Sequence, residues 1–164
     1  QEPDMIQKLQ DEDALPTQLY LSTNAADYES FMKINKPKYD DSWERWNKTL
    51  DMLKHLNTRT VLRITLIKDY NDQRESIPAF AEMFRKASPH FIEIKSYMHI
   101  GRSTNRLEHE NMLEMDEVKN FSEEIAKQSK IFSIMDESII SRISILQNNE
   151  RFIDRFISTY ANTI

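Results

Sequence analysis

The stretch Phe91–Ser103, FIEIKSYMHIGRS, decides how the rest of this 164-residue chain is interpreted. Its first residues alternate apolar side chains with Glu93 and Lys95, and this period of two is typical of a β-strand. The strand runs toward Gly101, the single glycine of the chain, which permits backbone angles and close approaches that other residues do not. A buried strand that delivers a lysine to such a turn indicates a site at the edge of a sheet.

Two further segments have the same character. Thr60–Ile67 (TVLRITLI) is rich in β-branched residues and runs into a lysine, and Thr17–Ser22 (TQLYLS) is a third strand candidate. Helical patterns separate the three segments, so we predict a parallel sheet with right-handed crossovers, in which ligands bind at the carboxyl ends of the strands. The residues expected to meet at that edge are Ser22–Asn24, Lys68–Asn71 and Lys95–His99.

Apolar residues at helical spacing predict the helices between these strands. The predicted helices are a short one around Met5–Leu9, one capped by Asp27, one from Asp41 or Ser42 to Leu56, one over Gln73–Lys86 and one over Asp116–Gln128. Trp43 and Trp46 are interpreted as core residues, with base stacking as the alternative. Lys130–Asp136 and Ile139–Gln147 are predicted to form an antiparallel hairpin around Glu137 and Ser138, with a terminal helix over Arg151–Ile164.

Composition narrows the range of functions. The formal net charge is −5, so any contact with nucleic acid must come from a local basic patch. There is no cysteine, which excludes disulfides and thiolate metal sites within this chain, and the four histidines show no zinc spacing, so no metal ligand is predicted. We see neither a signal peptide nor an apolar run of about 18 residues, so we expect a cytoplasmic protein without membrane contact.

Five segments, taken together, resemble the archaeal tRNA 4-demethylwyosine synthases, which are wyosine-forming radical S-adenosylmethionine (SAM) enzymes. The segments are LPTQLYLS, FMKINKP followed by WERWNKTLDML, RTVLRITLIKDYND, FIEIKSYMHIGRS and SRISILQN. They occur in order between about Leu15 and Asn149, and the third and fourth are long and unusual. The chain therefore resembles the carboxyl-terminal half of these enzymes.

The resemblance implies a fold, a domain organisation and a reaction. The implied fold is α/β, the carboxyl-terminal part of an incomplete (β/α)6 TIM-like barrel over residues 1–129, followed by a family-specific hairpin and tail over 130–164. The implied reaction is that of a radical SAM lyase, which condenses N1-methylguanosine at position 37 of phenylalanine tRNA with pyruvate to give 4-demethylwyosine.

The same resemblance implies 4Fe–4S clusters and SAM as cofactors of the full-length enzyme. The cluster cysteines would lie upstream of Gln1, in an amino-terminal half that is the missing partner of this chain. The fragment by itself is then expected to be inactive.

The candidate catalytic residues are Lys95 and Lys68. An amine forms a Schiff base with a keto acid such as pyruvate when burial or a nearby cation lowers its pKa. The alternative is that each lysine forms a structural ion pair with a neighbouring acid, for instance Glu93, or lies in solvent. Alternation places Glu93 and Lys95 on one strand face, so they would share a polar pocket if that face lines the barrel.

The remaining candidates are assigned to cofactor and substrate. Ser22, Asn24 and Arg63 are the candidate contacts for SAM, with Arg63 suited to a carboxylate and a structural ion pair as its alternative. In related sequences the position of Asn24 is commonly Asp, and the change removes a charge. The candidate contacts of substrate or tRNA are Glu93, Tyr97, His99, Arg102 and Arg106. The two arginines form a modest basic patch with Lys95, and the alternative is an ordinary solvated loop.

Two other functions stay open at this point. The chain could be a stand-alone α/β module that binds tRNA or a protein through Gly101–Glu114, or a piece of a lysine-dependent, aldolase-like barrel. A three-stranded parallel sheet also leaves an exposed edge, which a dimer could cover.

Overall fold

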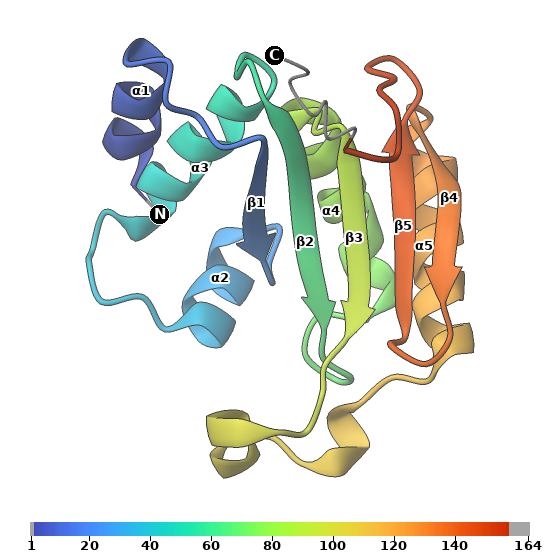
Figure 1. Ribbon diagram of the computed structural model, residues 1–164. Helices are drawn as coiled ribbons and strands as arrows, with labels where there is room; N and C mark the ends of the chain where they lie inside the picture. The colour runs from blue at the N-terminus through green and yellow to red at the C-terminus, as the bar shows by residue number, and fades with distance from the viewer. Residues whose placement is uncertain (1, 158–164) are drawn as a thin grey trace.

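The computed structural model describes residues 2–157 of the chain, and its centre is a five-stranded mixed sheet with the strand order β1-β2-β3-β5-β4 (Figure 1). The strands are β1 (Gln18–Thr23), β2 (Arg59–Leu66), β3 (Phe91–Ser96), β4 (Phe132–Ser138) and β5 (Ile143–Asn148). β1, β2 and β3 run parallel, whereas β5 is antiparallel to both β3 and β4. The predicted direction of the first three strands and the predicted closing hairpin are both confirmed.

The register of the central strand fixes the neighbours of the candidate lysine. Glu93 lies opposite Arg63 of β2, and Lys95 lies opposite Thr65 of β2 and Ile143 of β5. Because side chains alternate along a strand, the side chains at these positions share one face of the sheet.

The helices follow the apolar periodicity closely. They are α1 (Pro3–Asp11), α2 (Tyr28–Asn35), α3 (Ser42–Leu53), α4 (Ile77–Ala87) and α5 (Met115–Ser129), with short 3-10 turns η1 (Arg74–Ser76), η2 (Gly101–Asn105) and η3 (His109–Asn111). The carboxylate of Asp27 accepts a hydrogen bond from the Ser30 amide at 2.9 Å, which confirms the predicted cap of α2. The predicted helix over 73–86 is divided into η1 and α4, and α4 has a proline in its first turn.

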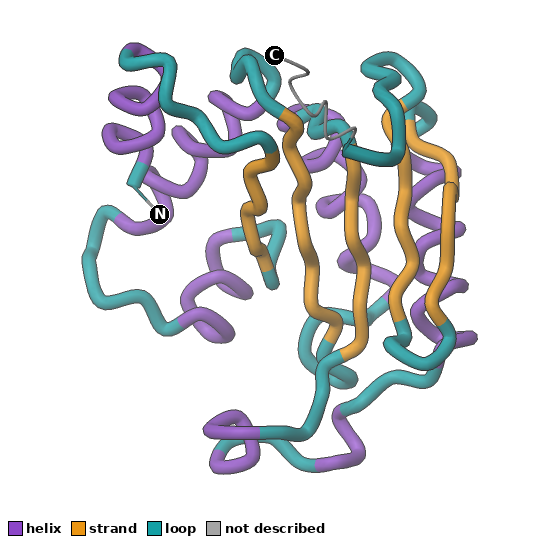
Figure 2. The backbone as a smooth tube through the Cα atoms, in the orientation of Figure 1, coloured by secondary structure: helices purple, strands orange, loops and turns teal. Residues whose placement is uncertain are grey.

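One face of the sheet carries the core. Leu62, Ile64, Ile92 and Ile94 are fully buried and belong to the same apolar cluster as residues of α3, α4 and α5. Trp46 of α3 is fully buried in this cluster, as predicted. Figures 1 and 2 show α4 and α5 behind the sheet, while no described helix crosses its near face. The sheet therefore has a helix-covered face and an open face.

The closing hairpin differs from the prediction at its turn. β5 begins at Ile143 rather than at Ile139, and the turn occupies residues 139–142 instead of centring on Glu137 and Ser138. Ile139 and Ile140 extend the apolar pattern of the strand in sequence, but no described residue covers them, and they are 75% and 97% exposed. The chain turns through Arg142, whose φ of 49° is left-handed.

The predicted terminal helix over Arg151–Ile164 is wrong for residues 151–157, which contain no helix; residues 158–164 lie outside the described part. The tail is held instead by side chains from the sheet. Arg59 donates hydrogen bonds to the carbonyls of Asp154, Arg155 and Phe156, the second at 2.8 Å. Residues 149–157 turn back across the amino-terminal end of β3 without forming a helix (Figure 1).

The predicted domain boundary at residue 129 falls where α5 ends. Both sides of it contribute to the same sheet and core, because β5 pairs with β3 and α5 packs on β4 and β5. The division into two parts stays a prediction. Within residues 2–157, no helix combines the length and the apolar character needed to cross a membrane.

Candidate functional site

The open face of the sheet carries a cluster of charged and aromatic side chains from the three parallel strands. Arg63 donates from Nε to Oε1 of Glu93 at 2.8 Å, and its guanidinium carbon lies 4.5 Å from the ring centroid of Tyr20 on β1. The Arg63 side chain is 36% exposed and that of Glu93 is 11% exposed. The carboxylate that Arg63 holds in this structure is therefore Glu93, the structural ion pair among the two predicted alternatives.

The charges of this cluster change the pKa of Tyr20. Burial raises the pKa of its phenol above the ordinary value, and the negative charge of Glu93 raises it further, whereas Arg63 acts in the opposite direction. The Tyr20 hydroxyl is therefore a neutral hydrogen-bonding group at neutral pH. The phenol therefore carries no negative charge that would repel an anionic substrate.

Lys95 lies on the same open face, two residues beyond Glu93. It is half-buried, and no hydrogen bond or ion pair within residues 2–157 engages its ammonium group. The predicted placement of Glu93 and Lys95 on one face agrees with the alternation of the strand, since the intervening Ile94 is fully buried in the core on the other side. Glu93 pairs with Arg63, which leaves Lys95 as an amine directed at the open side of the sheet.

Lys68 has a different environment. Its Nζ atom lies 2.7 Å from Oε1 of Glu117 on α5, a helix of the covered face. The hydrogen bond and charge of Glu117 raise the pKa of the Lys68 ammonium above its ordinary value. The structure thus does not bring the two candidate lysines together, and a raised pKa disfavours the neutral amine that attacks a carbonyl.

At the end of β1, Ser22 is exposed, whereas the amide of Asn24 is engaged within the chain. Asn24 Oδ1 accepts from the Thr65 amide at 3.4 Å, and its backbone carbonyl accepts from Asn71 at 2.9 Å. Asn24 therefore ties the carboxyl ends of β1 and β2 together. Only the Thr65 bond engages the side-chain oxygen of Asn24, so this amide keeps hydrogen-bonding capacity for a ligand.

The segment after β3 is organised by Tyr97, which is 5% exposed. Its hydroxyl lies 3.1 Å from Nδ1 of His99 and 3.1 Å from Oγ of Ser103. Arg102 follows on η2 as an exposed side chain. Of the predicted tRNA contacts, Tyr97 and His99 thus form one hydrogen-bonded unit, and Arg102 lies outside it.

This segment returns to the sheet through a pair of tethers. The Lys68 amide donates to the Asn111 carbonyl at 2.9 Å, while the Asn111 side chain donates back to the Lys68 carbonyl at 3.1 Å. Further along, the Leu113 amide donates to Oγ of Ser96 at 2.8 Å. Residues 97–113 therefore form a loop closed at both ends on the carboxyl edge of the sheet, visible below β2 and β3 in Figure 1.

A cavity of about 410 Å³ opens between this loop, α2 and the ends of the parallel strands. Its charged lining residues are Lys33, Lys36 and Arg106, and Tyr70 and Tyr97 also line it. Arg106 and Tyr97 were predicted, but the two lysines of the α2 region were not. Their spacing of three residues is visible in the sequence, but the apolar pattern that predicts this helix carries no information about its polar face.

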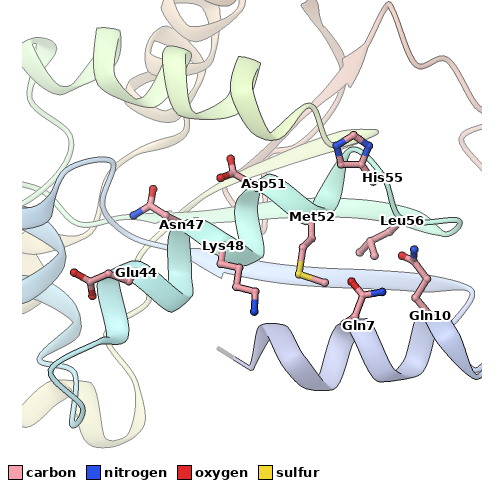
Figure 3. Close-up of a pocket in the computed structure, with 9 residues that line it drawn as sticks. All are labelled: Gln7, Gln10, Glu44, Asn47, Lys48, Asp51, Met52, His55 and Leu56. Atoms are coloured by element: carbon pink, nitrogen blue, oxygen red, sulfur yellow. The ribbon is translucent and has the colours of Figure 1, made fainter.

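A second cavity, of about 560 Å³, lies between α1 and α3, away from the carboxyl edge of the sheet. Figure 3 shows Gln7 and Gln10 of α1 and Met52 of α3 facing each other across it. The two helices are joined by exposed ion pairs such as Lys48 with Asp4 at 2.8 Å. None of the predicted site residues lines this cavity.

The side chains of this chain limit the cofactors that it can hold by itself. It has no cysteine, so it offers no thiolate for an iron–sulfur cluster. Within residues 2–157, no three His, Asp or Glu side chains converge as a metal site.

Residues 86–148, which run from the end of α4 through the central strand and the closing hairpin, match the protein family described as wyosine base formation. The chain belongs to this family. A tRNA 4-demethylwyosine synthase of Methanocaldococcus jannaschii is 41% identical over 153 residues, which are 92% of this chain and 45% of that protein. The chain thus spans less than half the length of the curated relatives it matches.

Solved structures agree with this family. A structure of TYW1 with a bound lysine–pyruvate adduct superposes with a TM-score of 0.79 at 40% identity, covering 92% of this chain and 45% of that one. Coproporphyrinogen III oxidase from Escherichia coli, a radical SAM enzyme, shares the fold with a TM-score of 0.58 at 11% identity, covering 92% and 33%. The mixed α/β sheet of the wyosine family member is therefore a fold that a radical SAM enzyme also uses.

Proposed function

We propose that this chain is the carboxyl-terminal half of an incomplete radical SAM barrel that forms 4-demethylwyosine from N1-methylguanosine-37 of phenylalanine tRNA and pyruvate. The family membership supports the reaction, and the open sheet face supports the geometry, since a barrel interior is lined by such a face. The half that supplies cluster cysteines would complete the barrel over this face. SAM supplies the radical chemistry when bound there, and Ser22 and Arg63 are its candidate contacts in this chain.

Lys95 is the proposed Schiff-base residue. The observation that carries this assignment is an amine without an acidic partner on the open face, and a structure of the related TYW1 has a lysine–pyruvate adduct bound. The uncharged amine adds to the keto carbon of pyruvate, and water leaves as the C=N bond forms. Lys68 is the weaker candidate because its ion pair with Glu117 raises the pKa of its ammonium group and so favours the protonated form.

The test is reductive trapping of pyruvate on the chain with borohydride, followed by peptide mass spectrometry. We expect one reduced adduct on Lys95, no adduct in Lys95→Arg, and an unchanged adduct in the matched control Lys68→Arg. Both substitutions keep the positive charge, so a difference between them reports the nucleophile.

A second readout covers the case in which pyruvate binding needs the complete barrel. In the enzyme that contains this chain, Lys95→Arg should abolish 4-demethylwyosine formation on methylated tRNA, whereas Lys68→Arg should retain it. Equal loss in both variants, or trapping on Lys68, would overturn the assignment to Lys95.

A further inference from the structure

The 410 Å³ cavity between α2 and the 97–113 loop has the lining of a site for an anion. The charged side chains that line it, Lys33, Lys36 and Arg106, are all cations, although the chain as a whole has a net charge of −5. Within residues 2–157 none of the three forms an ion pair with a carboxylate. Cations gathered without compensating acids in a concave surface raise the local concentration of anions.

The same cavity also has a flat apolar wall. Tyr70 is 36% exposed at its rim, with the Lys33 ammonium over one ring face at 5.8 Å from the centroid, so a base would stack on the other face. Ile34, Ile67, Tyr97 and Leu107 line the rest. Bases of single-stranded nucleic acid stack on exposed aromatic rings of this kind. A volume of about 410 Å³ lies within the range of about 300–1,000 Å³ found for small-ligand sites, and it suits one nucleotide.

We propose that this cavity is a nucleotide subsite, in which Tyr70 stacks on a base and Lys33, Lys36 and Arg106 hold its phosphate. The shared chemistry, a base with an attached phosphate, is offered both by single-stranded RNA and by free nucleotides. That the nucleotide belongs to RNA rests on the proposed function. SAM fits this lining poorly, because its sulfonium and ammonium groups are cations among three cations.

The position of the subsite explains how it would serve a reaction at Lys95. The cavity lies at the carboxyl ends of the parallel strands, and Thr65 of β2 is one of its lining residues. In the register of the sheet, Thr65 lies directly opposite Lys95 of β3. A nucleotide held there would fix one neighbour of the base that reacts. The subsite would therefore determine which nucleotide of an RNA strand lies at Lys95, and it would take no part in the reaction itself.

The experiment measures binding of the 164-residue chain to a single-stranded RNA heptamer and to AMP over a series of salt concentrations. Lys33→Gln and Arg106→Gln should each weaken RNA binding and lower the slope of log affinity against log salt by about 0.7 per lost phosphate contact. Tyr70→Ala should weaken binding about fivefold or more, with the salt slope unchanged. Lys127→Gln is the matched control, because Lys127 is an exposed lysine of α5 whose side chain is 73% exposed and does not line the cavity.

The outcomes separate the two sources of nucleotide and the two proposals. RNA binding stronger than AMP binding assigns the site to a polynucleotide, and the reverse assigns it to a free nucleotide. Absence of binding to both probes, equal effects of Lys33→Gln and Lys127→Gln, or displacement of the probe by SAM would each overturn the subsite. Trapping of pyruvate on Lys95 depends on none of these residues, so failure of either proposal is recognised independently.

Discussion

At the scale of single residues, His90 shows how a polar group is buried at no cost at neutral pH. It lies just before β3, and its Nδ1 atom accepts from the Thr60 amide at 3.1 Å and lies 2.9 Å from Oγ1 of Thr60. Burial, with Arg151 and Arg59 nearby, lowers the pKa of His90 from 6.5 to about 4. Burial and the positive charge of two arginines thus keep the His90 ring neutral.

This lowered pKa predicts a stability loss in acid. A histidine whose pKa is lower in the folded than in the unfolded chain opposes protonation of the folded state, so its contribution is full above pH 6.5 and is lost as pH falls toward 4. The free energy of unfolding should fall by at most about 1.4 kcal/mol per pH unit from this group. Urea titrations at several pH values would measure it.

The control is His90→Asn, whose side-chain oxygen can still accept from Thr60 but does not titrate in this range. The acid-dependent loss between pH 6.5 and 4 should be smaller in this variant than in the parent chain. Identical pH profiles for the two proteins would show that His90 does not carry the effect.

At the scale of elements, α3 owes its attachment to Trp46, which is fully buried and whose Nε1 has no hydrogen-bond partner among the described residues. Trp46→Ala should reduce the free energy of unfolding by about 3–5 kcal/mol, because a large cavity remains. Trp46→Phe should cost about 2 kcal/mol or less, since it removes a little apolar area together with an unsatisfied donor. Denaturant unfolding compares the two, and equal losses would mean that the indole N–H is satisfied in solution.

The elements also show what sequence patterns can predict. β2, β3 and the helices were predicted because period-two and helical patterns report burial on one face, and the core lies where those patterns place it. The hairpin turn was misplaced because Ile139 and Ile140 continue an apolar pattern without any partner to cover them. Residues 151–157, part of the predicted tail helix, contain no helix, and Arg59, almost a hundred residues away in sequence, donates to three of their carbonyls.

In the candidate site, too, local sequence patterns predicted some neighbours, whereas contacts between residues far apart in sequence could not be predicted. Lys95 and Glu93 could be placed together from the alternation within one strand. The partner of Lys68 could not, because Glu117 comes from a helix 49 residues further on and only tertiary packing joins them. Lys33 and Lys36 could not be predicted either, because only the tertiary structure brings α2 and the 97–113 loop together around one cavity.

At the scale of the whole molecule, Arg59 at the start of β2 holds residues 154–156 of the tail against the sheet. Arg59→Met should remove the hydrogen bonds to residues 154–156 and make the tail more accessible to proteases. Limited proteolysis should then cut within residues 150–157 faster than in the parent chain. The control Arg85→Met removes an exposed arginine that pairs with Glu82 on α4, and it should leave the cleavage rate unchanged. Equal rates in both variants would mean that Arg59 does not hold the tail.

The paired tethers at Asn111 and Ser96 have a mechanical consequence for the molecule. Since the loop between them is anchored at its start and its finish, an RNA strand pulling on Arg106 would tilt the rim without drawing β3 out of register. A ligand held at the rim would then move with the loop, while the Lys95 amine keeps its place on β3.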